Sequence, residues 1–198
     1  MKREVYRMPK RPQVLPVKRR EDFAAPAIAP APAVVAVDRA TECHVTPPEV
    51  AARMVEYLGS QGDYLTLEPS AGTGNLSRAL LAAGHSRYEL VQVERHHALA
   101  GGLHQFGTVI QECFLEYAER VRGKVEFPRI IMNPPFSQVR RHVAAARALL
   151  GRGGRDRATL VALVPVTFEI GGAEMLEYLD EFTFPTAKVR TKIIRLTA

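Results

Sequence analysis

The sequence predicts an α/β fold in which a largely parallel β-sheet is covered by helices on both faces. Short apolar segments, typical of buried strands, alternate along the chain with segments of helical periodicity. Glycines follow several of the helical segments, where helices commonly stop. Seven segments qualify as strands, so a chain of 198 residues has no room for a second folded domain.

One helix precedes the first predicted strand and a second helix follows it. Thr46 is a natural N-cap, and the two prolines after it suit the first turn of a helix over 49–58. Apolar residues over 64–67 predict a short strand. Helical spacing over 76–83 then ends at a glycine, and a second apolar strand is expected over 88–93.

The middle of the chain repeats this alternation. Residues 96–105 have helical spacing, although two adjacent glycines weaken it, and 108–110 predicts a third strand. The segment 114–121 predicts a short helix or turn, 129–132 a fourth strand, and 139–150 a helix that ends before a Gly-rich stretch. Strands joined through helices of this length indicate parallel pairs.

The C-terminal segment departs from that pattern. A fifth strand is expected over 159–164 and a helix over 173–179. The segments 181–184 and 189–196 alternate apolar and polar residues with no helix between them. They therefore predict a terminal antiparallel pair.

The first 38 residues differ in composition from the remainder. Between Lys2 and Asp22, eight Lys and Arg residues oppose three acids, and Pro and Ala are frequent up to Pro32. Such a segment cannot hold a helix and predicts a disordered tail, followed by a single folded domain over 39–198. The tail is either a basic arm that lies along phosphates or a solvated extension.

The composition also bounds the class of protein. The chain is 46% hydrophobic, has a formal net charge of +6 and contains two cysteines, which suits a globular protein in a reducing compartment. No apolar run reaches the roughly 18–20 residues of a membrane helix. Prolines and acids near the N-terminus argue against a targeting peptide. We expect a cytoplasmic protein with no membrane partner, and its six histidines show no spacing typical of metal ligands.

A Gly-rich segment follows the first predicted strand. It runs from Glu68 to Asn75 and has the sequence Glu-Pro-Ser-Ala-Gly-Thr-Gly-Asn. Its glycines permit positive φ and close approach of the backbone to a ligand, and the helix that follows presents unpaired N–H groups. Glu94 stands at the end of the second strand, where a carboxylate suits two ribose hydroxyls. Together these features predict a site for a ligand that contains a nucleoside.

A second motif, Asn133-Pro134-Pro135-Phe136, follows the fourth strand. The Asn133 side-chain oxygen and the Pro134 carbonyl can each accept a proton of one amino group, and the paired prolines stiffen the loop. Phe136 offers a face on which a flat base can stack. Because an in-line displacement mainly requires positioning of the nucleophile, this motif is suited to holding an amine.

The two motifs, in this order, resemble those of the S-adenosylmethionine-dependent N6-adenine nucleic-acid methyltransferases. The resemblance covers the chain from about Thr46 onward and is to the small enzymes of bacteria, phages and mobile elements. It implies a Rossmann-like methyltransferase fold with a seven-stranded sheet whose last strand is antiparallel. It also implies S-adenosylmethionine as the cofactor.

The same resemblance implies roles for individual residues. The Gly-rich loop would hold the amino-acid part of the cofactor, with Glu68 near the ammonium group, and the stretch at Thr46 would close over the methionine end. Cys113 stands where the family often has an aspartate that accepts from the adenine amino group, and a thiol is a poor acceptor, so Glu112 or a backbone group is the alternative acceptor. The expected catalytic residues are Asn133, Pro134, Pro135 and Phe136. The expected cofactor-binding residues are Thr46, Glu68, Ser70, Ala71, Gly72, Gly74, Asn75, Glu94 and Cys113.

Several substrates fit these acceptors. Adenine N6 in DNA is the first expectation, and a base in duplex DNA would have to be flipped into the site. RNA or a protein glutamine amide are alternatives, and a catalytically weak nucleic-acid-binding or interaction protein is an alternative of a different class. The arginines just beyond the second motif suit either phosphates beside a flipped base or a solvated helix face; they are Arg140, Arg141, Arg147, Arg152, Arg155 and Arg157. Since no target-recognition domain is expected, sequence specificity would be short or would come from a partner or a homodimer.

Overall fold

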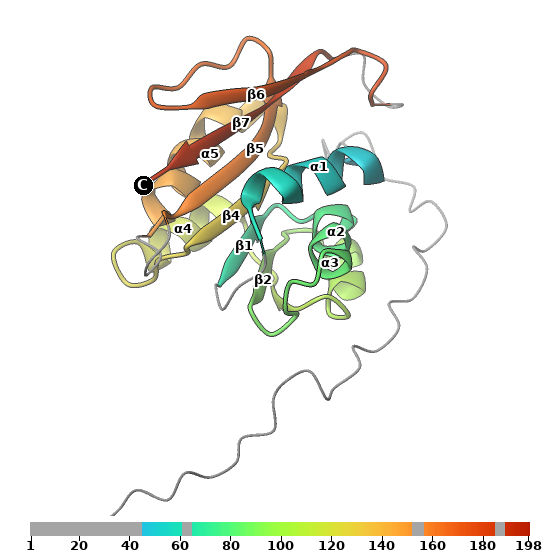
Figure 1. The fold of residues 1–198 in the computed structure, drawn as a ribbon. Coiled ribbons are helices and arrows are strands. Elements are labelled where there is room, and N and C mark those ends of the chain that lie inside the picture. The colour runs from blue at the N-terminus through green and yellow to red at the C-terminus, as the bar shows by residue number, and fades with distance from the viewer. Residues whose placement is uncertain (1–44, 61–64, 152–156, 185–188) are drawn as a thin grey trace, which may run out of the picture. The chain divides into compact units, whose positions relative to one another are not determined.

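A seven-stranded sheet forms the centre of the fold (Figure 1), in the order β3-β2-β1-β4-β5-β7-β6. The structure is a computed structural model that describes residues 45–60, 65–151, 157–184 and 189–198. The strands are β1 (Thr66–Pro69), β2 (Leu90–Val93), β3 (Thr108–Ile110), β4 (Arg129–Met132), β5 (Thr159–Pro165), β6 (Glu174–Leu179) and β7 (Thr191–Thr197). The predicted 1–38 tail lies outside the described residues.

The directions of the strands confirm the predicted sheet. Strands β1 to β5 pair with one another in parallel, whereas β7 is antiparallel to both β5 and β6. The chain leaves β1 towards β2 and β3 and then crosses back to β4 on the other side of β1. In open α/β sheets, ligands bind outside the carboxyl ends of the strands at such a reversal.

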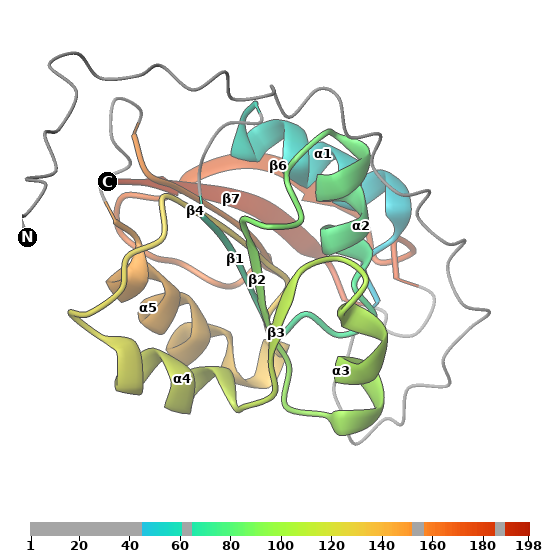
Figure 2. The ribbon, with the colours of Figure 1, turned by 90° about the horizontal axis from the view of Figure 1, so that it is seen from below.

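Helices cover both faces of the sheet. They are α1 (Pro48–Leu58), α2 (Asn75–Ala82), α3 (His97–Leu103), α4 (Phe114–Val121) and α5 (Val139–Leu149). One apolar core joins α1, α2 and α3 to one face, and a second joins α4 and α5 to the other (Figure 2). Strand β4 lies between these cores, with Ile131 in the first and Ile130 and Met132 in the second. All four of its residues are buried, and the three that follow Arg129 are apolar, as expected of a central parallel strand.

The prediction of a helix over 173–179 is wrong, because this segment is strand β6. The pairing register with β7 shifts between Met175 and Glu177, which marks a β-bulge. Leu176 and Leu179 both pack in the core on the α1 face. In a regular strand, residues three apart point to opposite faces, so the bulge produces a spacing that imitates a helix.

One strand of the predicted terminal antiparallel pair is wrong as well. Residues 181–184, expected as a strand, lie in the turn after β6. Asp180 shapes this turn, because its Oδ1 accepts from the Phe182 backbone N–H at 2.9 Å and from the Thr183 hydroxyl at 3.1 Å. Such Asx contacts compete with strand pairing. The antiparallel pair itself exists, formed by β6 and β7.

The role of Thr46 as N-cap of the first helix is also corrected. Pro47 occupies the N-cap position of α1, with φ −58° and ψ 144°, and no side chain caps the helix there. The Thr46 hydroxyl instead accepts from the Asn133 side chain, as described below. The helix therefore begins one residue later than its capping signal predicts, which is a common margin at helix ends.

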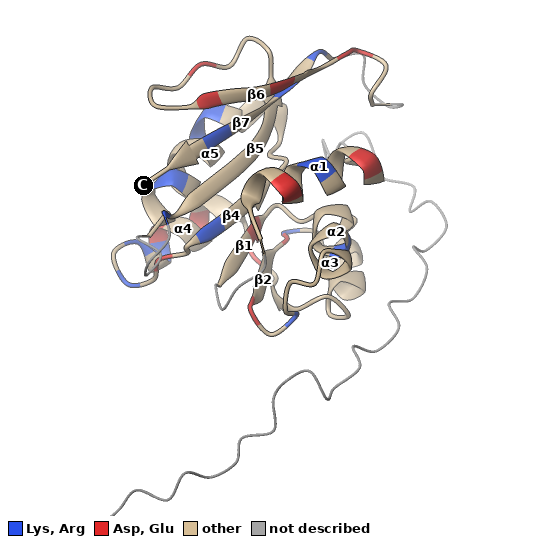
Figure 3. Ribbon diagram, in the orientation of Figure 1, with Lys and Arg blue, Asp and Glu red and all other residues tan. Residues whose placement is uncertain are grey.

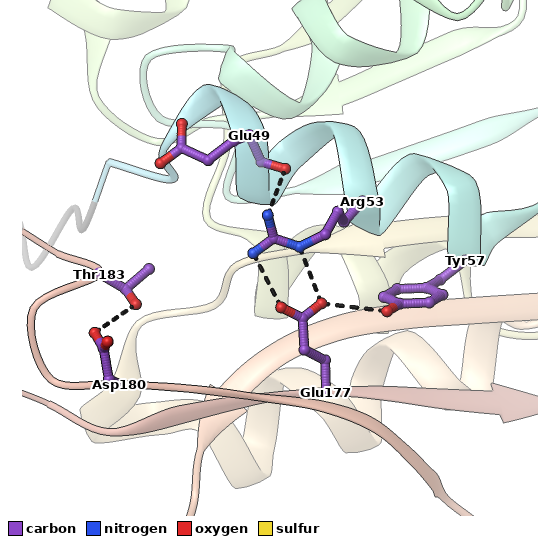
Figure 4. A network of polar contacts seen from close by, with 6 residues as sticks. All are labelled: Glu49, Arg53, Tyr57, Glu177, Asp180 and Thr183. Carbon is purple, nitrogen blue, oxygen red and sulfur yellow. Dashed lines mark hydrogen bonds and ion pairs between the residues drawn. The ribbon is translucent and has the colours of Figure 1, made fainter.

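A polar cluster fixes α1 against β6 (Figure 4). Arg53 contacts both carboxylate oxygens of Glu177 at 3.0 Å, and the Tyr57 hydroxyl donates to the same carboxylate at 3.2 Å. The guanidinium also donates to the Glu49 carbonyl at 3.3 Å. Helix α1 thereby connects the outer strand of the sheet to the segment that carries Thr46. Within the described part of the chain, no helix combines the length and apolarity needed to cross a membrane.

Candidate functional site

A cavity opens at the carboxyl ends of β1, β2, β3 and β4. The loop after each of these strands contributes to its wall. The sequence-predicted residues that border it are Thr46, Glu68, Ser70, Ala71, Gly72, Asn75, Glu94, Cys113, Asn133 and Pro135. Three further predicted residues, Gly74, Pro134 and Phe136, are outside the cavity lining. The two sequence motifs, about sixty residues apart in the chain, thus meet at one site.

The Gly-rich loop turns sharply where β1 ends. Ser70, Gly72 and Gly74 all have positive φ, at 57°, 57° and 79°. For Ser70 this conformation is uncommon and is a mark of functional loops. Gly74 has the positive φ that the sequence predicted for this loop, and an added Cβ would also lie 2.8 Å from atoms of Leu103 and Phe106. This close packing is a second reason for glycine, which the sequence prediction did not include.

Glu94 holds the Gly-rich loop against the end of β2. Its carboxylate is 4% exposed and accepts from the Gly72 backbone N–H at 2.8 Å and from the His96 N–H at 2.8 Å. Each contact uses a different oxygen of the carboxylate. Since an ionised carboxylate offers about four acceptor positions, both oxygens retain capacity for a ligand hydroxyl.

Glu68 lies at the bottom of the cavity in a buried chain of polar groups. Gln92 donates through Nε2 to the Leu103 carbonyl at 3.2 Å, so its Oε1 faces Ser77. The Ser77 hydroxyl contacts that Oε1 at 2.7 Å and also contacts Glu68 Oε2. A hydroxyl has one proton to give, so both contacts are satisfied when Glu68 is protonated and donates to Ser77.

Burial is consistent with that proton arrangement. It raises the pKa of Glu68 to about 8, against the opposing effect of the hydrogen bonds from Ser77. The negative charge of Glu94 nearby adds to the rise in pKa. At neutral pH Glu68 is therefore a mostly neutral acid.

Thr46 connects the two motifs. Its backbone carbonyl accepts from Asn75 Nδ2 at 2.7 Å, and its hydroxyl accepts from Asn133 Nδ2 at 3.0 Å. With the Asn133 amide nitrogen on the side of Thr46, the amide oxygen occupies the opposite side. The sequence prediction gave Thr46 a cofactor role and missed this contact, which spans 87 positions in the chain.

The remainder of the Asn-Pro-Pro-Phe motif supports the loop. Pro134 is buried, and Pro135 borders the cavity at the start of a 3-10 turn, η3 (Phe136–Gln138). The Phe136 ring packs edge-on against Phe184, with centroids 6.4 Å apart and planes at 90°. Phe184 belongs to the core on the α1 face, so Phe136 joins the loop to that core in this structure.

The end of β3 lacks a free carboxylate for an amino group. Cys113 borders the cavity as the N-cap residue of α4. Its neighbour Glu112 also borders the cavity, but its carboxylate is bound by Arg120 at 2.5 and 3.3 Å. Phe114, the first residue of α4, is buried beside them.

His142 is a cavity residue that the sequence prediction missed. It lies in the first turns of α5, is 5% exposed, and its ring is tilted over Phe114 with centroids 5.7 Å apart. Burial lowers its pKa, and the positive charges of Arg141 and Arg95 act in the same direction. A signal was present in the sequence, because His142 shares the helical period of the buried residues Val143, Ala146 and Leu149.

Charged residues are unevenly distributed over the fold (Figure 3). Basic residues lie along α5, beside the cavity, whereas acids lie on β6, the outer strand at the far edge of the sheet. Arg140 and Arg141 are exposed at the start of α5, close in sequence to the second motif. Arg140 lies over the Phe168 ring at 5.7 Å, and Arg147 donates to the Gly171 carbonyl at 3.0 Å.

Comparisons with known proteins place the fold. No family model matches the chain, and no curated protein matches it in sequence. A modification subunit of a putative type I restriction enzyme from Vibrio vulnificus is similar with a TM-score of 0.64 and 17% identity, over 78% of this chain and 44% of that one. TrmN from Thermus thermophilus is similar with a TM-score of 0.56 and 15% identity, over 76% of this chain and 48% of that one. The 23S rRNA methyltransferase ErmE has a TM-score of 0.55 and 20% identity, over 75% of this chain and 67% of that one.

The chain spans less than half the length of the first two of these proteins. At such low identity, the likeness concerns the fold. The chain therefore has the Rossmann-like methyltransferase fold, with a cavity at the strand ends where that fold binds its ligands.

Proposed function

We propose that this protein is an S-adenosylmethionine-dependent methyltransferase that modifies an exocyclic amine. Among the substrates that fit, we propose adenine N6 in DNA. The observation that best supports the proposal is that the Gly-rich loop, Glu94 and Asn133 all border the same cavity. A cofactor loop and an amine-holding loop have to face one space if a methyl group is to pass between their ligands.

The groups around the cavity fit the chemistry of the cofactor. Backbone at Ser70 and Gly72 approaches the cavity in a positive-φ turn, suited to the amino-acid part. The Glu94 carboxylate has acceptor capacity for ribose hydroxyls, and Phe114 offers an apolar surface for a purine. When bound, S-adenosylmethionine would supply a methyl group already activated by a positively charged sulfur.

The residues of the chain then have a positioning task. Asn133 is held through its amide nitrogen by Thr46, so its oxygen is the end of the amide suited to accept a proton from the substrate amine. The Pro134 carbonyl, in a stiff loop, would accept the second proton. The nitrogen lone pair then points in line with the methyl group. Asn133 and Pro134 would hold the amine while it accepts the methyl group, and the proton that the amine gives up would pass to solvent.

A nucleic-acid substrate is supported by two features. The exposed Arg140 and Arg141 stand at the start of the helix that follows the amine-holding loop. Phosphate contacts at such a position would orient a base next to the cavity. The names of several similar structures also refer to modification of nucleic acid, including the rRNA methyltransferase and a dimethyladenosine transferase from Plasmodium falciparum.

The test is to measure N6-methyladenine by mass spectrometry in DNA and RNA of cells that lack adenine methylases of their own. Cells would express the wild-type chain, Asn133→Ala, or the control Gln105→Ala. Gln105 is exposed and donates only to the nearby Gly102 carbonyl. We expect a mark in DNA with the wild type and the control, reduced roughly 10²–10³-fold in Asn133→Ala because one preorganised contact is lost.

The other outcomes separate the alternatives. A mark confined to RNA would replace DNA as the substrate while retaining the reaction. Modification of glutamine in protein, without a nucleic-acid mark, would transfer the proposal to a protein substrate. If the purified protein also failed to bind S-adenosylhomocysteine, the proposed enzyme would be refuted in favour of a binding module.

A further inference from the structure

The cavity lacks the usual kind of acceptor at the end of β3. An adenine ring that enters there presents a 6-amino group, which needs a hydrogen-bond acceptor when it leaves water. The Cys113 thiol is a weak acceptor. The Glu112 carboxylate is a strong acceptor, but Arg120 contacts both of its oxygens, so a ligand amino group would have to share them with the guanidinium.

His142 has the properties of the missing acceptor. Its Nδ1 lies 3.2 Å from the Gln138 carbonyl, which can only accept, so Nδ1 carries the proton of the neutral ring. In that tautomer Nε2 has a lone pair and no proton. The described residues offer Nε2 no hydrogen-bond partner, and the ring borders the cavity.

The ring is held in place by its surroundings. The helix places His142 among buried residues, next to Val143 and one turn before Ala146. Its contact with Phe114 restricts rotation of the ring, and the Gln138 carbonyl fixes its tautomer. The positive charges of Arg95 and Arg141 oppose protonation, so the lone pair persists at neutral pH. Such a preorganised acceptor loses little entropy when a ligand binds.

We propose that His142 Nε2 accepts from the 6-amino group of the cofactor's adenine and replaces the carboxylate that Cys113 cannot supply. The inference rests on the proposed function, because it assumes an adenosyl cofactor in this cavity. It makes His142 a specificity-determining residue for adenine over purines that lack the amino group. It also ties cofactor recognition to α5, the helix that directly follows the amine-holding loop.

The test uses two ligands that differ only at this contact. One is S-adenosylhomocysteine, and the other is the analogue with unsubstituted purine in place of adenine. Calorimetry would give the ratio of their dissociation constants for the wild type, His142→Phe and His142→Gln. We expect the wild type to prefer the adenosyl ligand roughly 10- to 100-fold, the value of one buried hydrogen bond. We expect His142→Phe to bind both ligands about equally.

The Gln variant separates a contact from a structural role. Its side-chain oxygen can stand near the position of Nε2, so part of the preference should return, while circular dichroism verifies that all three proteins are folded. An undiminished preference in His142→Phe would overturn the inference, as would an equal loss of affinity for both ligands in that variant. If the wild type binds both ligands equally, the inference fails but the proposed function stands. If it binds neither, both fail.

Discussion

The two sides of the sheet are built in different ways. Strands β1 to β5 are parallel, lie between helices, and deliver the cavity residues at their carboxyl ends. Strands β7 and β6 are antiparallel, and β6 and its turn expose the apolar residues Met175, Tyr178 and Phe182 by 45%, 63% and 76%. The first side joins its loops through buried polar contacts, whereas the second is joined to α1 by a partly exposed ion pair. We expect substitutions in the two sides to differ accordingly.

The largest effect is expected from Glu94→Ala. This change removes the acceptor of two short backbone contacts, from Gly72 and His96, and any contact with ribose. Each buried N–H left without a partner is costly, so affinity for S-adenosylhomocysteine should fall roughly 100-fold or more. Calorimetry measures this, with Glu94→Gln as the matched control that keeps one acceptor and should lose less. An unchanged affinity in Glu94→Ala would mean that the cavity does not bind ribose.

The second prediction concerns the pH dependence of stability. The folded-state pKa of Glu68 is raised from 4.5 to about 8, so between these values the folded protein holds a proton that the unfolded chain has released. Its contribution to stability is therefore complete below about pH 4.5, declines as pH rises to about 8, and is constant above that. The slope is about 1.4 kcal/mol per pH unit for one proton.

Glu68→Gln removes this titration while keeping a neutral side chain of similar shape. Thermal unfolding of the wild type and the variant between pH 5 and 8 gives the difference in their stability at each pH. The contributions of all other titrating groups cancel in this difference. We expect the wild type to lose stability relative to Glu68→Gln as pH rises. A difference in stability that does not change with pH would show that Glu68 is ionised in the folded protein. The assignment of donors, in which Glu68 donates to Ser77 and Ser77 donates to Gln92, would then be wrong.

The third prediction tests the connection between the motifs. Thr46→Val removes the hydroxyl that accepts from Asn133 Nδ2, with almost no change in volume. The Asn133 amide would then be free to rotate, so the rate of methyl transfer should fall roughly 10-fold, while cofactor affinity changes little. Steady-state kinetics separates kcat from KM, and Thr46→Ser should restore the rate. A loss of cofactor affinity alone would support the original expectation that Thr46 contacts the cofactor.

The smallest effect is expected at β6. Arg53→Met and Glu177→Gln each break the pair that fixes α1, and their coupling in a double-mutant cycle should be about 0.5 kcal/mol, because both side chains are partly exposed. Arg195 on β7 and Glu174 on β6 form an ion pair with a more exposed carboxylate and are the matched control, with a smaller expected coupling. Denaturant unfolding measures both. If the coupling free energy at Arg53–Glu177 were as large as the binding free energy lost in Glu94→Ala, the two sides of the sheet would not differ as expected.

The same contrast explains what the sequence could predict. The parallel side follows from local signals, since buried strands such as β4 contain short apolar runs and their ends carry the recognisable motifs. The order of the motifs was therefore enough to predict that Glu94 and Asn133 share a site. Strand β6 could not be predicted in this way, because a bulge places Leu176 and Leu179 on one face with helical spacing.

Long-range polar contacts were the other limit. The bond from Asn133 to Thr46 joins positions far apart in the chain, and neither residue alone indicates the other. The positive φ of Gly74 followed from the predicted loop, but its packing against Phe106 and Leu103, which also excludes a larger side chain, did not. His142 had a visible helical period, yet its access to the cavity depends on how α5 packs beside α4. Such contacts are properties of tertiary packing rather than of local sequence.

The most direct test of the account is a crystal structure of the protein with S-adenosylhomocysteine. We predict ribose hydroxyls within hydrogen-bond distance of Glu94, the amino-acid part on the backbone of Ser70 to Gly72, and the sulfur facing the side of the cavity formed by Asn133. A ligand bound with its sulfur turned away from Asn133, or bound outside this cavity, would contradict the claim that the two motifs form one methyl-transfer site.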